Sequence, residues 1–158
     1  MAKKETKTNA MRILERMAIA YEHTEYECDE FRDGSSVADL LGLPHEEVFK
    51  TLVAVGPDQS NNVFVIPVDE ELDLKKCARS VGAKSVRLIP MKELFALTGY
   101  VRGGCTAIGM KKQFPTRLDE SAVLFDKIYV SGGRIGSQIR LSPEDFLRAA
   151  EAEYAELT

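Results

Sequence analysis

The sequence predicts a mixed α/β fold in one domain that spans residues 1–158. Segments with helical spacing of apolar residues alternate with short runs that are rich in β-branched and aromatic residues. No linker, internal repeat or low-complexity stretch interrupts that order. The composition, with 44% hydrophobic and 29% charged residues, is typical of a globular domain and argues against a disordered chain.

The N-terminal half is expected to place a hairpin after two short helices. Residues 1–7 are predicted to be a flexible, basic N-terminus. Thr8 is placed to cap the first helix, and Gly42 to close the second. The expected elements, in order, are a helix at 9–17, a strand at 21–28, a helix at 35–42, a helical turn at 44–47 and strands at 48–55 and 63–67.

The C-terminal half is expected to continue with helices and a second hairpin. Asp73 is placed to cap a helix whose inner side carries Leu74 and Cys77. The elements expected after it are a strand at 84–88, a helix from Pro90 to Gly99, a hairpin with strands at 127–131 and 137–141, and a final helix that begins at Ser142 and runs to about Tyr154.

Charge is distributed unevenly along the chain. The net charge is −4, but the segment from Lys75 to Arg117 contains ten basic residues and one acidic residue, Glu93. A basic surface on an acidic protein can hold a phosphate backbone locally. The alternative is a set of solvated helix faces that bind nothing.

Several classes of protein are disfavoured by the sequence. No apolar run approaches membrane length, and the basic N-terminus is not followed by the apolar segment of a secretory signal. Three cysteines at wide spacing fit the reduced thiols of a cytoplasmic protein better than a disulfide framework or a zinc site. We therefore expect a cytoplasmic protein with no membrane partner, no bound metal and no cofactor.

Two features could carry chemistry. Lys50 lies in the apolar strand 48–55, where an ammonium group must be paired with an acid, hydrated, or used in binding or catalysis. The alternative is a lysine that snorkels to the surface. The glycine-rich segment 99–109 contains Gly103 and Gly104, which would let backbone amides approach a ligand oxygen. The chain has no G-x-S-x-G, H-E-x-x-H or C-x-x-C motif. These groups can orient a substrate and stabilise an oxyanion, but they do not supply an activated nucleophile.

Four motifs in order resemble the YbaK/EbsC family of aminoacyl-tRNA deacylases, which are related to the editing domain inserted in bacterial prolyl-tRNA synthetases. The motifs are K-T-N-A-M-R-I-L at 7–14, F-K-T-L at 49–52, T-G-Y-V-R-G-G at 98–104 and I-Y-V-S-G-G-R-I-G at 128–136. The likeness covers nearly the whole chain, and it is strongest to the branch of Cys-tRNA(Pro) deacylases.

The resemblance implies a central mixed, barrel-like β-sheet with peripheral helices. It makes Lys50 the essential lysine of the family, and Gly103 and Gly104 the glycine pair whose amides would meet the developing oxyanion. The substrate contacts that it implies are Tyr26, Thr51, Thr106 and Ser131. Lys111 and Lys112, which follow the glycine-rich segment, are expected to bind the nucleic acid.

The implied activity is removal of cysteine from mischarged Cys-tRNA(Pro), with the substrate's own thiol attacking its ester carbonyl. Cys105 is then expected to be part of the pocket wall. The implied partners are tRNA(Pro) and, as a further candidate, prolyl-tRNA synthetase.

Two departures from the family pattern bear on amino-acid specificity. The family often reads G-G-x-S-P where this chain has G-G-C-T-A at 103–107, and an aromatic residue of many relatives is replaced here by Phe31 or Asp33. Three alternatives therefore stay open: a deacylase for alanine or serine on tRNA(Pro), a non-catalytic module that binds tRNA or a synthetase, and a hydrolase for a smaller ester or amide.

Overall fold

The computed structural model describes residues 7–27 and 33–158. The expected flexible N-terminus, apart from Lys7, lies outside the described residues, and so do Cys28 and Phe31. Within the described ranges every helix is too short or too polar to cross a bilayer.

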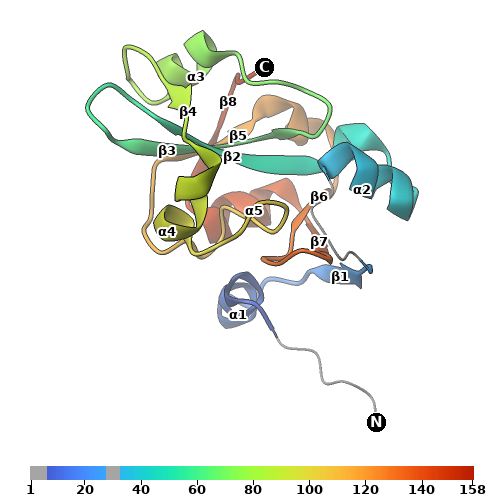
Figure 1. The fold of residues 1–158 in the computed structure, drawn as a ribbon. Helices are drawn as coiled ribbons and strands as arrows, with labels where there is room; N and C mark the ends of the chain where they lie inside the picture. Colours follow the sequence, from blue (N-terminus) through green and yellow to red (C-terminus); the bar gives the residue numbers. More distant parts are fainter. Residues whose placement is uncertain (1–6, 28–32) are drawn as a thin grey trace.

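A five-stranded mixed sheet forms the centre of the fold (Figure 1). Its middle is the antiparallel hairpin of β2 (Phe49–Val55) and β3 (Asn61–Pro67), as the sequence predicts. β4 (Arg87–Leu88) pairs with the end of β2. On the other side, β5 (Thr116–Asp119) runs parallel to β3, and β8 (Ala152–Ala155) runs parallel to β5. The mixed α/β class is confirmed.

A three-stranded antiparallel sheet lies beside the first. It consists of β1 (Glu22–Glu25), β7 (Ser137–Leu141) and β6 (Ile128–Ser131), in that order. A bridge between Val48 and Tyr129 connects β6 to the start of β2. Apolar side chains from both sheets share one core cluster, so the two sheets wrap around a common interior.

The helices lie around the sheets, and four of them begin at side-chain caps. Their bounds are α1 Asn9–Arg16, α2 Gly34–Leu41, α3 Leu74–Ser80, α4 Leu94–Thr98 and α5 Pro143–Ala150. Short 3₁₀ segments are η1 His45–Glu47, η2 Met91–Glu93 and η3 Glu120–Leu124. The caps are Thr8, Asp33, Asp73 and Ser142, each accepting a backbone N–H of the first turn. Of these, the sequence predicts all but Asp33.

Alternation along the central strands places different helices on the two faces of the five-stranded sheet. Phe64 on β3 is buried against Cys77 of α3, whereas its neighbour Val65 packs in the larger core with Phe146 of α5. Figure 1 accordingly shows α3 on one face of the sheet and α5 on the other.

Two expectations about helices are wrong. The final helix ends at Ala150 instead of near Tyr154, because Glu151 adopts a left-handed conformation with φ of 52° and the following residues pair as β8 with β5. Leu74 is not on the inner side of α3: it is 43% exposed, while Cys77 is fully buried. β5 was also not predicted from the sequence.

Candidate active site

The candidate site is a cavity of about 310 Å³ at an open edge of β2. β4 covers only Ala54 and Val55 of that strand. Ile89 donates its backbone N–H to the carbonyl of Val53 at 3.1 Å, so by strand alternation the N–H and C=O of Thr51 also point to this edge. No strand pairs with β2 at Thr51 on that side in the part of the chain that the structure describes. Thr51, which lines the cavity, therefore has backbone groups that no described strand pairs on this side.

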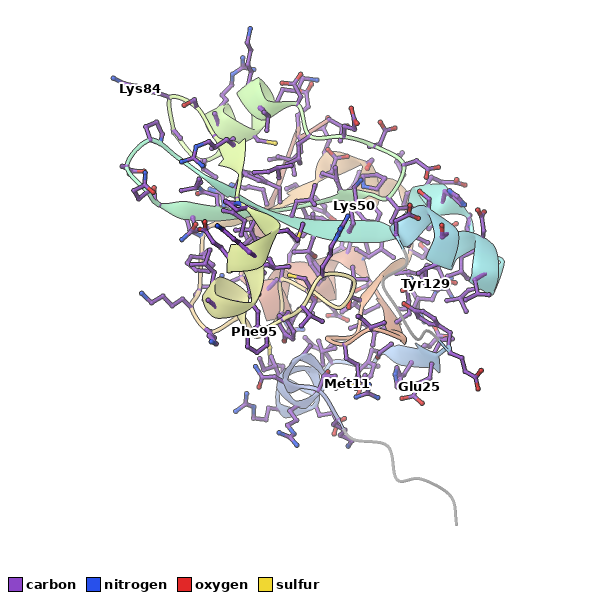
Figure 2. All side chains as sticks on the ribbon, in the orientation of Figure 1. Met11, Glu25, Lys50, Lys84, Phe95 and Tyr129 are labelled. Carbon is purple, nitrogen blue, oxygen red and sulfur yellow. The ribbon has the colours of Figure 1, made fainter. Side chains whose placement is uncertain are left out.

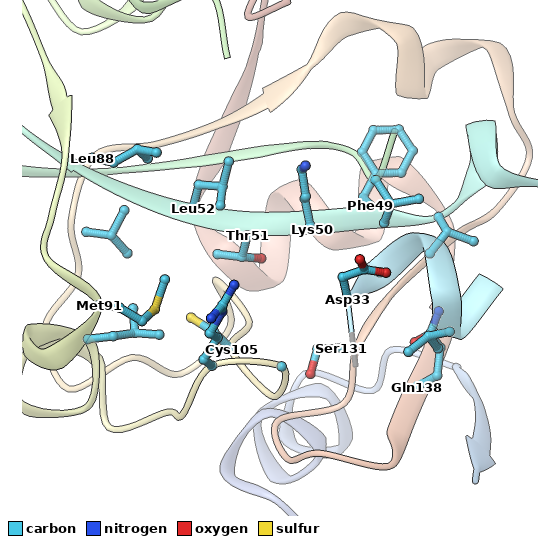
Figure 3. Close-up of a pocket in the computed structure, with 18 of the residues that line it drawn as sticks. Asp33, Phe49, Lys50, Thr51, Leu52, Leu88, Met91, Cys105, Ser131 and Gln138 are labelled. Atoms are coloured by element: carbon cyan, nitrogen blue, oxygen red, sulfur yellow. The ribbon is translucent and has the colours of Figure 1, made fainter. Parts of the chain in front are cut away.

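Lys50 lines this cavity and is half buried. Figure 3 shows it on β2, between the side of the cavity that carries Leu88 and the side that carries Asp33. Within residues 7–27 and 33–158 it makes no hydrogen bond or ion pair, although its charge helps to lower the pKa of Asp33 and of Asp69. A half-buried ammonium group without a fixed partner is available to a ligand.

Three of the predicted hydroxyl contacts line the same cavity: Tyr26, Thr51 and Ser131. Ser131 lies at the end of β6, where its hydroxyl accepts the N–H of Gly133 at 3.1 Å. Tyr26 follows β1, and its backbone N–H donates to the carbonyl of Gly136 at 2.9 Å. The structure thus brings together residues that are separated by more than 100 positions in the sequence.

The glycine-rich segment contributes only part of what the sequence predicts. Gly103, with φ of 87°, lines the cavity. Gly104 does not line it; its Cα faces the backbone of Arg134, because a Cβ built there would lie 2.7 Å from two backbone atoms of that residue. Thr106 is fully buried away from the cavity, and its hydroxyl faces the N–H of Ile108 at 3.4 Å.

Cys105 lies in the cavity wall, as expected from the sequence. Burial raises the pKa of its thiol to about 12. A thiol with that pKa is protonated at neutral pH, and the thiolate is the form that attacks carbonyl carbon. Cys105 is therefore poorly suited to act as a nucleophile.

Three polar residues of the cavity were not among the predicted site residues: Asp33, Arg102 and Gln138. Asp33 caps α2, and its pKa is lowered chiefly by the backbone N–H of Ser36. Gln138 is only 6% exposed, and its Nε2 has no hydrogen-bond partner in the described part of the chain. A buried amide donor of this kind is costly unless a ligand or water meets it. The sequence does not single out Gln138, because a glutamine within a predicted strand matches no functional motif.

The α2 side of the cavity is fixed by a cluster around His45. Its Nε2 lies 2.7 Å from a carboxylate oxygen of Asp39, and its Nδ1 lies 2.8 Å from one of Asp69. Hydrogen bonds to these two carboxylates raise the pKa of His45, and the bond to Asp39 contributes most. Ser35 at the start of α2 also donates to Asp69, at 2.5 Å. The cluster ties α2 to the segment after β3.

The basic segment from Lys75 to Arg117 divides into two parts. Lys76 pairs with Glu156 at 2.6 Å and Arg117 with Glu153 at 3.7 Å, so acids near the C-terminus partly compensate their charge. The predicted nucleic-acid contacts Lys111 and Lys112 lie elsewhere, exposed beyond the glycine-rich segment and outside the cavity. Part of the positive charge of this segment is therefore compensated within the protein.

Among the described residues, no group of three histidine, cysteine, aspartate or glutamate side chains is arranged to hold a metal ion. The polar groups that converge on the cavity are an ammonium, a guanidinium, hydroxyls, amides and one carboxylate. Such a set can bind an ester substrate with attached phosphates, and it can stabilise negative charge that develops on an oxygen.

Comparison with known proteins identifies the family. The model of the aminoacyl-tRNA editing domain matches residues 29–149. This chain belongs to the aminoacyl-tRNA editing domain family. The cavity lies within the matched region except for Tyr26, which precedes it.

Relatives of this editing domain agree with the assignment. The chain is 48% identical to EbsC of Enterococcus faecalis, named as a candidate Cys-tRNA(Pro)/Cys-tRNA(Cys) deacylase, over 100% of this chain and 98% of that protein. It is 31% identical to a proline–tRNA ligase of Shouchella clausii over 47% of this chain and 13% of the ligase. A crystal structure described as a candidate trans-editing enzyme for prolyl-tRNA synthetase superposes with a TM-score of 0.83 and 26% identity, over 98% of this chain and 99% of that one.

Proposed function

We propose that the protein is a trans-editing deacylase that removes cysteine from mischarged Cys-tRNA(Pro). The observation that carries the proposal is Lys50, half buried at the open edge of β2 and without a fixed partner among the described residues, inside a cavity sized for a small ligand. The name of the Enterococcus relative supports cysteine as the amino acid. We further propose that the whole chain acts as one domain in the cytoplasm, with tRNA(Pro) and prolyl-tRNA synthetase as partners.

In the proposed reaction, the sulfur of the substrate cysteine attacks its own ester carbonyl. A C–S bond forms, the bond from the carbonyl carbon to the ribose oxygen breaks, and the thiol proton passes to that oxygen. The products are cysteine thiolactone and free tRNA. The protonated thiol of Cys105 supports this scheme, because the described residues of the cavity then include no thiolate.

The protein's part in this reaction is to position the ester and stabilise charge. Lys50 is placed to contact the ester or the 3′ end of the tRNA, while the open N–H of Thr51 and the amide of Gln138 are donors for substrate oxygens. Gly103 allows the chain beside it to pass close to the substrate.

The first test is the rate with altered Lys50. Lys50→Met keeps most of the side-chain length without the charge, and Lys50→Arg keeps the charge. Loss of a positioned electrostatic contact costs about 3 kcal/mol, so we expect Lys50→Met to be slower by roughly a hundredfold while remaining folded. Near-normal deacylation by Lys50→Met would exclude Lys50 from the mechanism and favour a snorkelling lysine.

The second test compares tRNA(Pro) charged with cysteine, alanine and serine, with wild type and Cys105→Ala. We expect fast deacylation for cysteine and slow deacylation for serine, because a thiol has far more of its anion at neutral pH than a hydroxyl. A pocket alone separates near-isosteres by only ~10–200-fold. Cys105→Ala should keep most of the rate. Equal rates on cysteine and serine would refute the substrate-thiol scheme, preference for alanine or serine would reassign the substrate, and inactivity on all three would indicate a binding module or a different ester.

A further inference from the structure

Exposed apolar side chains border one side of the cavity. This strip, which we call the β4–α4 rim, consists of Leu88, Met91, Phe95 and Val101, which are 44–58% exposed. Leu88 and Met91 also line the cavity, and Figure 3 shows both on the side away from Asp33. Half of the large exposed hydrophobic residues in the described part of the chain belong to this rim. A cluster of that kind at the mouth of a cavity indicates a contact surface.

Cations accompany the rim. They are Lys92, Arg102, Lys111 and Lys112, all exposed. Neither Lys92 nor Lys112 makes an ion pair with any residue in the ranges 7–27 and 33–158, so their charges are not compensated there. The Nζ of Lys111 lies 5.3 Å from the centroid of the Phe95 ring. Even so, Phe95 is 58% exposed, which leaves room for a planar group on its ring.

The opposite side of the cavity carries negative charge. Asp33 lines it, and Asp39 and Asp69 flank His45 behind it. Two carboxylates around one histidine leave that cluster with a net negative charge, whereas the charges of Lys50 and Arg102 act on Asp33. A chain of phosphates that leaves the cavity is therefore repelled on the α2 side and attracted on the β4–α4 side.

We propose that the unpaired 3′ end of the tRNA lies along the β4–α4 rim, with the Phe95 ring stacking on one of its bases. The inference rests on the proposed function, and it adds the direction in which the RNA leaves the cavity. Exposed aromatic rings beside a cationic track are the means by which proteins hold single strands without reading their sequence. Figure 2 labels Lys50 on β2 and Phe95 on α4, and the rim that carries Phe95 begins at the cavity, because Leu88 and Met91 belong to both.

An apolar protein partner fits the rim less well than RNA does. Burial of Lys92 and Lys112 against a protein surface requires matching carboxylates, whereas phosphates along a single strand supply the opposite charge at each nucleotide. The choice between RNA and protein is decided by the experiment below.

The experiment measures binding of a fluorescent single-stranded ACCA ribonucleotide and of an abasic strand with the same number of phosphates. The variants are Phe95→Ala, Phe95→Trp and, as a control, Leu124→Ala, since Leu124 is 77% exposed on η3 and outside the rim. Loss of one stacked base weakens binding by roughly 5- to 150-fold. We expect Phe95→Ala to bind ACCA more weakly than wild type by this factor, and wild type to bind the abasic strand at least as weakly as Phe95→Ala binds ACCA. Phe95→Trp and Leu124→Ala should bind ACCA like wild type.

On full-length charged tRNA, Phe95→Ala should raise KM with little change in kcat, because stacking is equal in the ground and transition states. The proposal is overturned if wild type binds ACCA and the abasic strand equally, if Phe95→Ala leaves the affinity for ACCA unchanged, or if Leu124→Ala weakens it as much. Strand binding is measured without hydrolysis, so an inactive wild type would refute the proposed function while these outcomes still decide the role of the rim.

Discussion

Substitution of Gly104 by alanine tests whether this glycine serves packing or catalysis. A Cβ at position 104 would lie 2.7 Å from the Cα and the carbonyl carbon of Arg134 and 2.8 Å from the N of Ile135, whereas ordinary contact begins at 3.4 Å. All three neighbours are backbone atoms of the turn between β6 and β7, so no side chain can rotate away. Overpacking of this kind costs about 1–3 kcal/mol. For a chain of this size, that corresponds to a decrease in Tm of roughly 2–12 °C.

The assay combines thermal unfolding, followed by circular dichroism, with deacylation kinetics. We expect Gly104→Ala to lose both stability and kcat/KM, because Gly103 and Cys105 on either side of it line the cavity and would move with it. Gly82→Ala is the control. Gly82 has φ of 70°, which is strained for alanine, but no atom lies within 4 Å of the position that an alanine Cβ would occupy. This variant should therefore lose stability and keep its activity. An unchanged Tm for Gly104→Ala would refute the packing argument, and loss of activity at full stability would indicate that its amide acts on the substrate.

Two further predictions concern charge. The pKa of His45 is raised above its ordinary 6.5 by Asp39 and Asp69, so the cluster stabilises the fold fully below pH 6.5 and loses this effect as pH rises through the higher pKa of the folded state. The difference in unfolding free energy between wild type and His45→Gln should therefore shrink with rising pH, and a difference that grows instead would contradict the reasoning. Binding of different tRNAs should weaken with salt, and replacement of Lys111 and Lys112 by alanine should reduce the log–log slope by up to about 2. An unchanged slope would place the phosphate contacts elsewhere.

The sequence by itself determined the local elements of this protein. Helix caps at Thr8, Asp73 and Ser142 and the two hairpins depend on hydrogen bonds and side-chain alternation between residues close in the chain, which a sequence displays directly. Lys50 was also detectable, because a cation in an apolar strand departs from the local pattern. The ordered motifs indicated the family, which the comparisons show.

Only the tertiary structure decided the parallel strands and the lining of the cavity. β5 and β8 are short segments whose partners lie far away in the chain, so no local pattern distinguishes them from a loop and a continued helix. Gln138 and Asp33 enter the cavity, and Thr106 turns away from it, because of how distant segments pack. The direction of a side chain depends on neighbours that the fold brings together, and such neighbours are not visible in the order of residues.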